Sequence, residues 1–150
     1  MGAKEAGVTP PRAPFKRVVL DTNVIVSALL FRGPMARLHE LWKQRALTIL
    51  ASREIIEEYV SVLAYPKFDL TEGEIGNLLQ EELIPYIEPV KIPSALKSSR
   101  SADPDDEKFL LCAEAAQADA IVSGDAHLLR LKKVKRCPIV RPEKFLSQFR

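Results

Sequence analysis

Short apolar runs alternate along this chain with segments in which apolar residues recur every three or four positions. Runs of the first kind are typical of buried β-strands, and segments of the second kind are typical of helices with one buried face. The runs predict strands at 17–20, 47–51 and 120–123, a short strand near Val90, and a last strand at 138–140. Because predicted strands and helices alternate, the sequence indicates an α/β fold built on a parallel sheet.

Helical spacing fills the intervals between these strands, and several of the expected helices carry start signals. Ser52 is a natural N-cap, and Thr71 with Glu74 has the sequence of a capping box. Asp103 suits the N-cap of a later helix because a proline follows it at the first turn. The expected helices span 22–31, 35–43, 52–63, 71–83, 103–116 and 126–131.

Length and composition indicate one soluble domain. The chain has 150 residues, of which 47% are hydrophobic and 28% charged, as is usual for a globular protein with a single core. Residues 1–15 are rich in glycine and proline and predict a flexible tail, which leaves 16–150 as the folded domain. No apolar run approaches the roughly 20 residues of a membrane span, and the first residues lack the pattern of a secretory signal. We expect a cytoplasmic protein without membrane association.

The cysteines and histidines do not indicate a catalytic or metal site. Cys112 and Cys137 lack metal-type spacing and predict buried free thiols. His39 falls on the polar side of its expected helix, so it is interpreted as a surface residue. His127 lies at a helix start and is interpreted as a surface or capping residue.

Charge is distributed unevenly along the chain, although its net value is only +2. Residues 52–89 hold nine acidic residues and two basic ones, whereas residues 130–150 hold eight basic residues and one acidic one. The basic end could attract nucleic-acid phosphates, form a solvated face or dock an acidic partner. The candidates for contact with a nucleic-acid backbone are Arg130, Lys132, Lys133, Lys135 and Arg136.

Four acidic residues occupy equivalent positions in the predicted elements. Asp21 and Asp125 lie just past the carboxyl ends of strands. Glu58 and Asp106 lie at the inward edges of helices, where a carboxylate is costly unless a partner compensates it. The carboxyl ends of parallel strands meet at one edge of a sheet, so these side chains can converge there.

Each of these acids also has an ordinary structural interpretation. Asp21 could be a helix N-cap with Asn23 in an Asx turn, and Glu58 could be a solvated surface residue. Asp106 could be an acid favoured by the dipole of a helix start, and Asp125 could be a turn residue or the N-cap of 126–131. The shared placement of all four is what favours a site.

Crowded carboxylates repel one another unless a cation neutralises them. Oxygen ligands suit hard ions, so the sequence predicts Mg²⁺ or Mn²⁺, ions that can activate water against a phosphodiester. Other chemistries fit less well. A phosphate-binding glycine loop and a Ser-His-Asp arrangement are missing. A haloacid-dehalogenase-type phosphatase needs a second aspartate where Asn23 stands, and a receiver domain needs one where Ser52 stands.

Four motifs in order resemble the PIN-domain family, specifically its toxin components of toxin-antitoxin systems. The resemblance covers about residues 17–142, nearly the whole expected domain. The matching segments are 20–24 (LDTNV), 52–59 (SREIIEEY) with 62–63 (VL) and 66–68 (PKF), 103–110 (DPDDEKFL), and 122–125 (VSGD).

The resemblance implies a three-layer α/β/α sandwich with a central, mainly parallel sheet, Mg²⁺- or Mn²⁺-dependent RNA cleavage and frequent homodimers or higher homo-oligomers. It also implies a small antitoxin protein as a partner, and places the catalytic, metal-binding quartet at Asp21, Glu58, Asp106 and Asp125. Auxiliary residues are Asn23, Asp103, Asp105 and Ser123, the last standing where the family often has threonine. The expected function is a metal-dependent endoribonuclease; the alternative is a catalytically inactive PIN-like module that binds RNA or a partner.

Overall fold

Six strands form one sheet in the order β3-β2-β1-β4-β6-β5 in the computed structural model, which describes residues 15–96 and 104–149. Every neighbouring pair is parallel except β5 and β6, which are antiparallel. The strands are β1 (Arg17–Leu20), β2 (Thr48–Ser52), β3 (Ile87–Val90), β4 (Ala120–Val122), β5 (Lys133–Val134) and β6 (Cys137–Val140). The expectation of a mainly parallel sheet is therefore confirmed.

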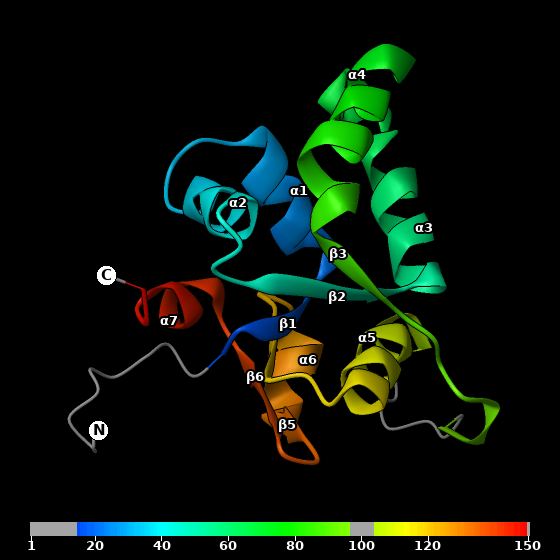
Figure 1. Ribbon diagram of the computed structural model, residues 1–150, viewed down its shortest axis with the longest axis vertical. Helices are drawn as coiled ribbons and strands as arrows, with labels where there is room; N and C mark the ends of the chain where they lie inside the picture. Colours follow the sequence, from blue (N-terminus) through cyan, green and yellow to red (C-terminus); the bar gives the residue numbers. More distant parts are fainter. Residues whose placement is uncertain (1–14, 97–103, 150) are drawn as a thin grey trace.

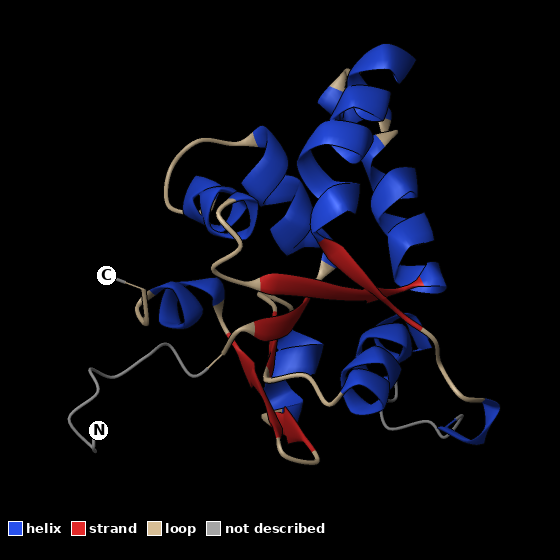
Figure 2. Ribbon diagram, viewed as in Figure 1, coloured by secondary structure: helices blue, strands red, loops and turns tan. Residues whose placement is uncertain are grey.

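Helices cover both faces of this sheet (Figure 1). Helices α1 to α4 lie on one side of β1 and β2, and α5 and α6 lie on the other, while α7 follows β6 near the end of the chain. The layers of helix and strand in Figure 2 confirm the predicted α/β/α sandwich. The helices are α1 (Thr22–Leu30), α2 (Ala36–Lys43), α3 (Arg53–Leu63), α4 (Glu72–Asn77), α5 (Pro104–Ala116), α6 (Ala126–Leu131) and α7 (Pro142–Leu146).

The predicted helix starts that fall within the described residues have the expected hydrogen bonds. The Ser52 side chain accepts a hydrogen bond from the Ile55 amide at 3.4 Å. Thr71 and Glu74 form the complete capping box that opens α4. Asp103, the expected N-cap of α5, lies outside the described residues, as do residues 1–14 of the expected tail.

Several elements differ from the sequence expectation. The helix predicted for 71–83 changes to a π-helix at Leu78–Leu83. Residues Ser94–Leu96, for which no helix was predicted, form a short 3₁₀-helix. The two-residue strand β5 and the helix α7 were not predicted, because neither is long enough to show a hydrophobic period. Among the described helices, we find none with the length and apolar character that a membrane crossing needs.

Strand β1 lies in the middle of the core. Val18, Val19 and Leu20 are completely buried, as expected for a parallel strand covered on both faces. Buried Tyr59 of α3 donates its hydroxyl to the Leu20 carbonyl at 2.5 Å. This bond fixes α3 against the residue that immediately precedes Asp21.

The cysteines are buried and free, as predicted. Burial raises the pKa of the Cys112 thiol, and that of the Cys137 thiol, to about 12. Both thiols therefore stay protonated near neutral pH and are poor nucleophiles.

Tyr59→Phe is expected to lower the free energy of unfolding by about 1 to 3 kcal/mol. The substitution keeps the buried ring but leaves the Leu20 carbonyl without its donor. Urea denaturation of the two proteins measures the difference. Tyr65→Phe is the matched control, because Tyr65 is 47% exposed and water can replace its hydroxyl contacts. An equal loss in both variants would contradict the role given to the buried hydrogen bond.

Candidate functional site

The chain reverses its direction across the sheet between β1 and β4. From β1 it continues to β2 and β3 on one side, and from β4 it continues to β6 on the other. The connections that leave the carboxyl ends of β1 and β4 therefore diverge, which opens a crevice at this edge. Asp21 follows β1 there, and its amide donates to the Val122 carbonyl of β4 at 3.0 Å.

A pocket of about 630 Å³ occupies this carboxyl edge. Asp21, Glu58, Asp106 and Asp125 all line it, although they come from four separate segments of the chain. Of the auxiliary candidates, Asn23 and Asp105 also line the pocket, Ser123 lies beneath it in contact with Asp21, and Asp103 is outside the described residues. The structure thus brings together the acids that the sequence placed in equivalent positions.

Asp21 is held from below by Ser123. The completely buried Ser123 hydroxyl donates to Asp21 Oδ2 at 2.5 Å and accepts from the Asp125 amide at 2.9 Å. One hydroxyl therefore links the carboxylate after β1 to the backbone after β4. Burial is the main cause that raises the pKa of Asp21, and the neighbouring carboxylates of Asp125 and Glu58 raise it further.

The inward-facing carboxylate of Glu58 is paired with a lysine and a hydroxyl group. Lys108 Nζ of α5 lies 2.7 Å from Glu58 Oε1, and the Thr22 hydroxyl of α1 donates to Glu58 Oε2. Lys108 also donates to the Asp105 carbonyl at 3.1 Å. The Glu58 carboxylate is therefore fixed at both oxygens by neighbours on two other helices.

Asp106 and Asp125 meet on the other side of the pocket. Ligand atoms of Asp106, Asp125 and His127 all lie within 4.8 Å of one another. Asp125 also accepts hydrogen bonds from the His127 and Leu128 amides at 2.7 and 3.2 Å. Asp125 is thus the N-cap of α6, as one interpretation predicted. Its carboxylate also lines the pocket, and the capping hydrogen bonds fix the direction of that carboxylate.

His127, Thr22 and Lys108 are the residues that sequence reasoning missed. Lys108 belongs to the 103–110 motif, but only the packing of α5 beside α3 shows that it reaches Glu58. The His127 side chain is 59% exposed, as a surface residue should be, yet its Nδ1 lies 3.8 Å from Asp125 Oδ1. Its position two residues after the candidate ligand Asp125 was the available signal.

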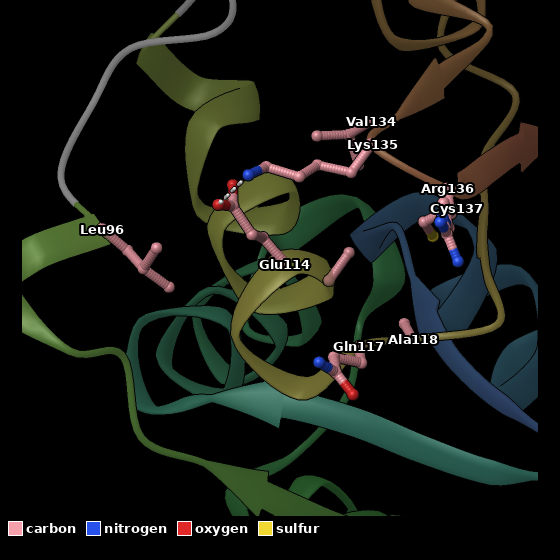
Figure 3. Close-up of a pocket in the computed structure, with 9 residues that line it drawn as sticks. Leu96, Glu114, Gln117, Ala118, Val134, Lys135, Arg136 and Cys137 are labelled. Atoms are coloured by element: carbon pink, nitrogen blue, oxygen red, sulfur yellow. Dashed lines mark ion pairs between the residues drawn. The ribbon is translucent and has the colours of Figure 1, made fainter.

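The predicted basic contacts lie elsewhere. None of the five lines the acidic pocket. Because β6 is parallel to β4, the turn between β5 and β6 lies at the amino edge of the sheet, opposite the acids. Lys135 and Arg136 from this turn line a second pocket of about 610 Å³, where Lys135 Nζ is 3.4 Å from Glu114 Oε2 (Figure 3).

The donor set of the acidic pocket suits a hard divalent cation. Asp106 and Asp125 offer carboxylate oxygens, and His127 offers a nitrogen donor, within 4.8 Å of one another, and Asp21 and Glu58 line the same pocket. Asp21 is a buried carboxylate whose ionised form is disfavoured, and a cation beside it would restore that form. The residues present therefore fit a bound divalent cation.

Comparisons with known proteins agree with this geometry. Residues 17–127 match the model of the PIN domain family. Among solved structures, the chain is similar to one in the crystal structure of VapBC2 from Rickettsia felis bound to a DNA fragment from their promoter. The TM-score is 0.57 at 15% identity, and the match covers 83% of this chain and 98% of that one, a likeness of fold. No curated protein matches the sequence.

Proposed function

The chain belongs to the PIN domain family, whose members are in general nucleases, and from this premise we propose that it is a Mg²⁺- or Mn²⁺-dependent endoribonuclease. The observation that carries the proposal is the convergence of four carboxylates from separate segments on one pocket at the sheet's switch point. Carboxylates that share one pocket repel one another unless a cation neutralises them. A divalent cation bound there could also promote hydrolysis of a phosphodiester.

In this proposal Asp21, Asp106 and Asp125 would hold the metal. When bound, the ion would lower the pKa of water and stabilise negative charge on the phosphate oxygens. Ser123 keeps Asp21 in place by donating to Oδ2, and the α6 amides keep Asp125 in place. Thr22 and Lys108 fix Glu58, which either binds the ion or orients the attacking water.

The basic residues of the 130–136 segment are proposed to contact the RNA backbone away from the cleaved bond. Their distance from the acidic pocket suits phosphates of a longer RNA that continues around the molecule. A role of this kind affects affinity and its salt dependence more than the chemical step.

We also propose that the protein is the toxin of a toxin-antitoxin pair and forms homo-oligomers. The likeness to a chain in the crystal structure of VapBC2 bound to a DNA fragment from their promoter supports this. A small antitoxin that covers the acidic pocket would block its access to RNA.

Incubation of the purified protein with RNA in Mn²⁺, in Mg²⁺ and in excess EDTA tests the activity. Cleavage that appears with either metal and disappears with the chelator is expected. A catalytically inactive RNA-binding or partner-binding module is the alternative, and calorimetric titration with Mn²⁺ separates the two. Absence of both cleavage and binding at millimolar Mn²⁺ would favour the inactive module.

Ser123→Ala is expected to weaken Mn²⁺ binding by about 10- to 100-fold. The change removes the hydroxyl that donates to Asp21 and accepts from the Asp125 amide. Ser123→Thr keeps that hydroxyl and is expected to bind Mn²⁺ within a few fold of the wild type. Calorimetry on the folded proteins measures both affinities. Equal affinities for the alanine and threonine variants would show that the hydroxyl does not orient a ligand.

A further inference from the structure

The side chain of His127 converges with two carboxylates beside the acidic pocket. A ring nitrogen of His127 and carboxylate oxygens of Asp106 and Asp125 all lie within 4.8 Å of one another. The chain has two histidines, and the other one, His39, lies in the contact between α2 and the π-helix, where its Nε2 is 2.8 Å from Glu82 Oε1. His127 is therefore the histidine that can supply an imidazole to the proposed metal site.

The backbone of His127 is fixed relative to Asp125. Asp125 Oδ1 accepts hydrogen bonds from the His127 and Leu128 amides at 2.7 and 3.2 Å, and the Asp125 amide donates to the Ser123 hydroxyl at 2.9 Å. Asp106 comes from the first turn of α5 and is buried. Because these donors stand on ordered backbone, little conformational entropy is lost when they bind one ion.

The separation of the imidazole from Asp125 fits two ligands of one cation better than it fits a hydrogen bond. His127 Nδ1 lies 3.8 Å from Asp125 Oδ1, beyond the roughly 2.7 to 3.2 Å of a hydrogen bond between nitrogen and oxygen. Two ligands of an octahedral ion with bonds of about 2.1 Å are about 3.0 Å apart when adjacent and about 4.2 Å apart when opposite. An ion between these groups therefore requires only a small movement of the His127 side chain.

A protonated His127 that only balances the charge of Asp125 is the ordinary alternative. The two interpretations predict opposite effects on metal binding. A balancing positive charge repels an incoming cation, so its removal would strengthen metal binding. Removal of a ligand would instead weaken it.

We propose that His127 is a ligand of the divalent cation in the acidic pocket, and that its nitrogen makes the site prefer Mn²⁺ to Mg²⁺. Mg²⁺ is bound in proteins mainly through carboxylate, phosphate and water oxygens, whereas imidazole is a common ligand of transition-metal ions. This inference rests on the proposed function for the presence of a metal. It adds to the carboxylates a residue that discriminates between the two ions.

Calorimetric titration of the metal-free, full-length protein with Mn²⁺ and, separately, with Mg²⁺ tests the inference. His127→Ala is expected to weaken Mn²⁺ binding by at least about 10-fold, since even residues that only orient metal ligands are worth about 10- to 100-fold. Mg²⁺ affinity is expected to change by no more than about 3-fold, because Mg²⁺ can replace a lost ligand by water.

Two further variants serve as a conversion and a control. His127→Asp replaces the nitrogen donor by an oxygen donor and is expected to lower the preference for Mn²⁺ over Mg²⁺ by about 10-fold. His39→Ala is the matched control, because His39 does not line the acidic pocket. It is expected to leave both affinities within about 2-fold of the wild type.

Pulsed electron paramagnetic resonance of the Mn²⁺-loaded proteins identifies the ligand directly. Coupling of the ion to a nitrogen nucleus is expected in the wild type and in His39→Ala, and its loss is expected in His127→Ala. Nitrogen coupling that persists in His127→Ala would assign the signal to another group and overturn the inference.

Unchanged or stronger Mn²⁺ binding by His127→Ala would also overturn the inference, as would an equal loss of affinity for Mn²⁺ and Mg²⁺. Metal-dependent RNA cleavage by the wild type, together with either result, would leave the proposed function standing. A wild type that binds Mn²⁺ through His127 but cleaves no RNA would defeat the proposed function alone.

Discussion

Asp21→Asn is expected to reduce metal-dependent RNA cleavage by at least about 1000-fold while the fold stays intact. The asparagine is nearly isosteric, and its amide oxygen can still accept the hydrogen bond from Ser123. It cannot supply the negative charge that draws a cation to the carboxyl end of β1. Cleavage of labelled RNA under single-turnover conditions measures the loss of activity, and circular dichroism of the variant shows whether the fold is intact.

The same substitution is expected to stabilise the metal-free protein at neutral pH. Burial raises the pKa of Asp21 in the folded state above its ordinary value of 3.8. Between the two pKa values the unfolded chain has released a proton that the folded chain retains, so the free energy of unfolding falls as the pH rises through this window. Asparagine does not titrate and avoids the loss, which urea denaturation in EDTA at pH 4 and pH 7 can measure.

Asp119→Asn is the matched control at the other end of β1. Its Oδ2 accepts from the Lys16 and Arg17 amides at 2.9 and 2.8 Å, so it supports the fold and lies away from the acidic pocket. We expect this variant to lose some stability and to keep its activity within a few fold. Undiminished cleavage by a folded Asp21→Asn protein would end the proposal that this carboxylate holds the metal.

Glu58→Gln is expected to lower the cleavage rate by about 100- to 10,000-fold, the range found when a group that positions water or protons is removed. The neighbouring Glu57 lines the same pocket but pairs with exposed Arg53 at 3.3 Å instead of with Lys108. Glu57→Gln removes the same charge from the same pocket, and we expect it to change the rate by no more than a few fold.

Comparison of these two glutamine variants tests whether one particular carboxylate is needed, or only the total negative charge of the pocket. If only the summed charge of the pocket mattered, both variants would lose the same activity. Mn²⁺ affinity, measured by calorimetry, is expected to fall in Glu58→Gln and to change little in Glu57→Gln. A larger loss of activity in Glu57→Gln than in Glu58→Gln would mean that Glu57, and not Glu58, is the functional acid of α3.

The sequence was sufficient for a mainly parallel sheet and for every strand except β5, and it placed two acids just past strands. Strand β1 could be predicted because three apolar residues end at Asp21, and the same pattern before Asp125 predicted a second carboxylate at the same edge. Glu58 could be predicted because a carboxylate at an inward helical position is costly without compensation. In each case the spacing of apolar residues along a strand or helix indicated which side chains face the core.

The partners of these acids could not be predicted in the same way. Lys108 is 50 positions from Glu58, and Thr22 is 36 positions from it. Such contacts depend on how α1, α3 and α5 pack, which no local period encodes.

The indole of Trp42, the single tryptophan of the chain, is fully buried and donates to the Glu82 carbonyl of the π-helix at 2.8 Å. His39 lies beside it, with ring centroids 5.1 Å apart, and its Nε2 is 2.8 Å from Glu82 Oε1. The only tryptophan of the chain therefore lies at the contact between α2 and this segment. Its emission should shift to the red when the segment leaves α2, and stay constant when only the carboxylate edge changes its ligands.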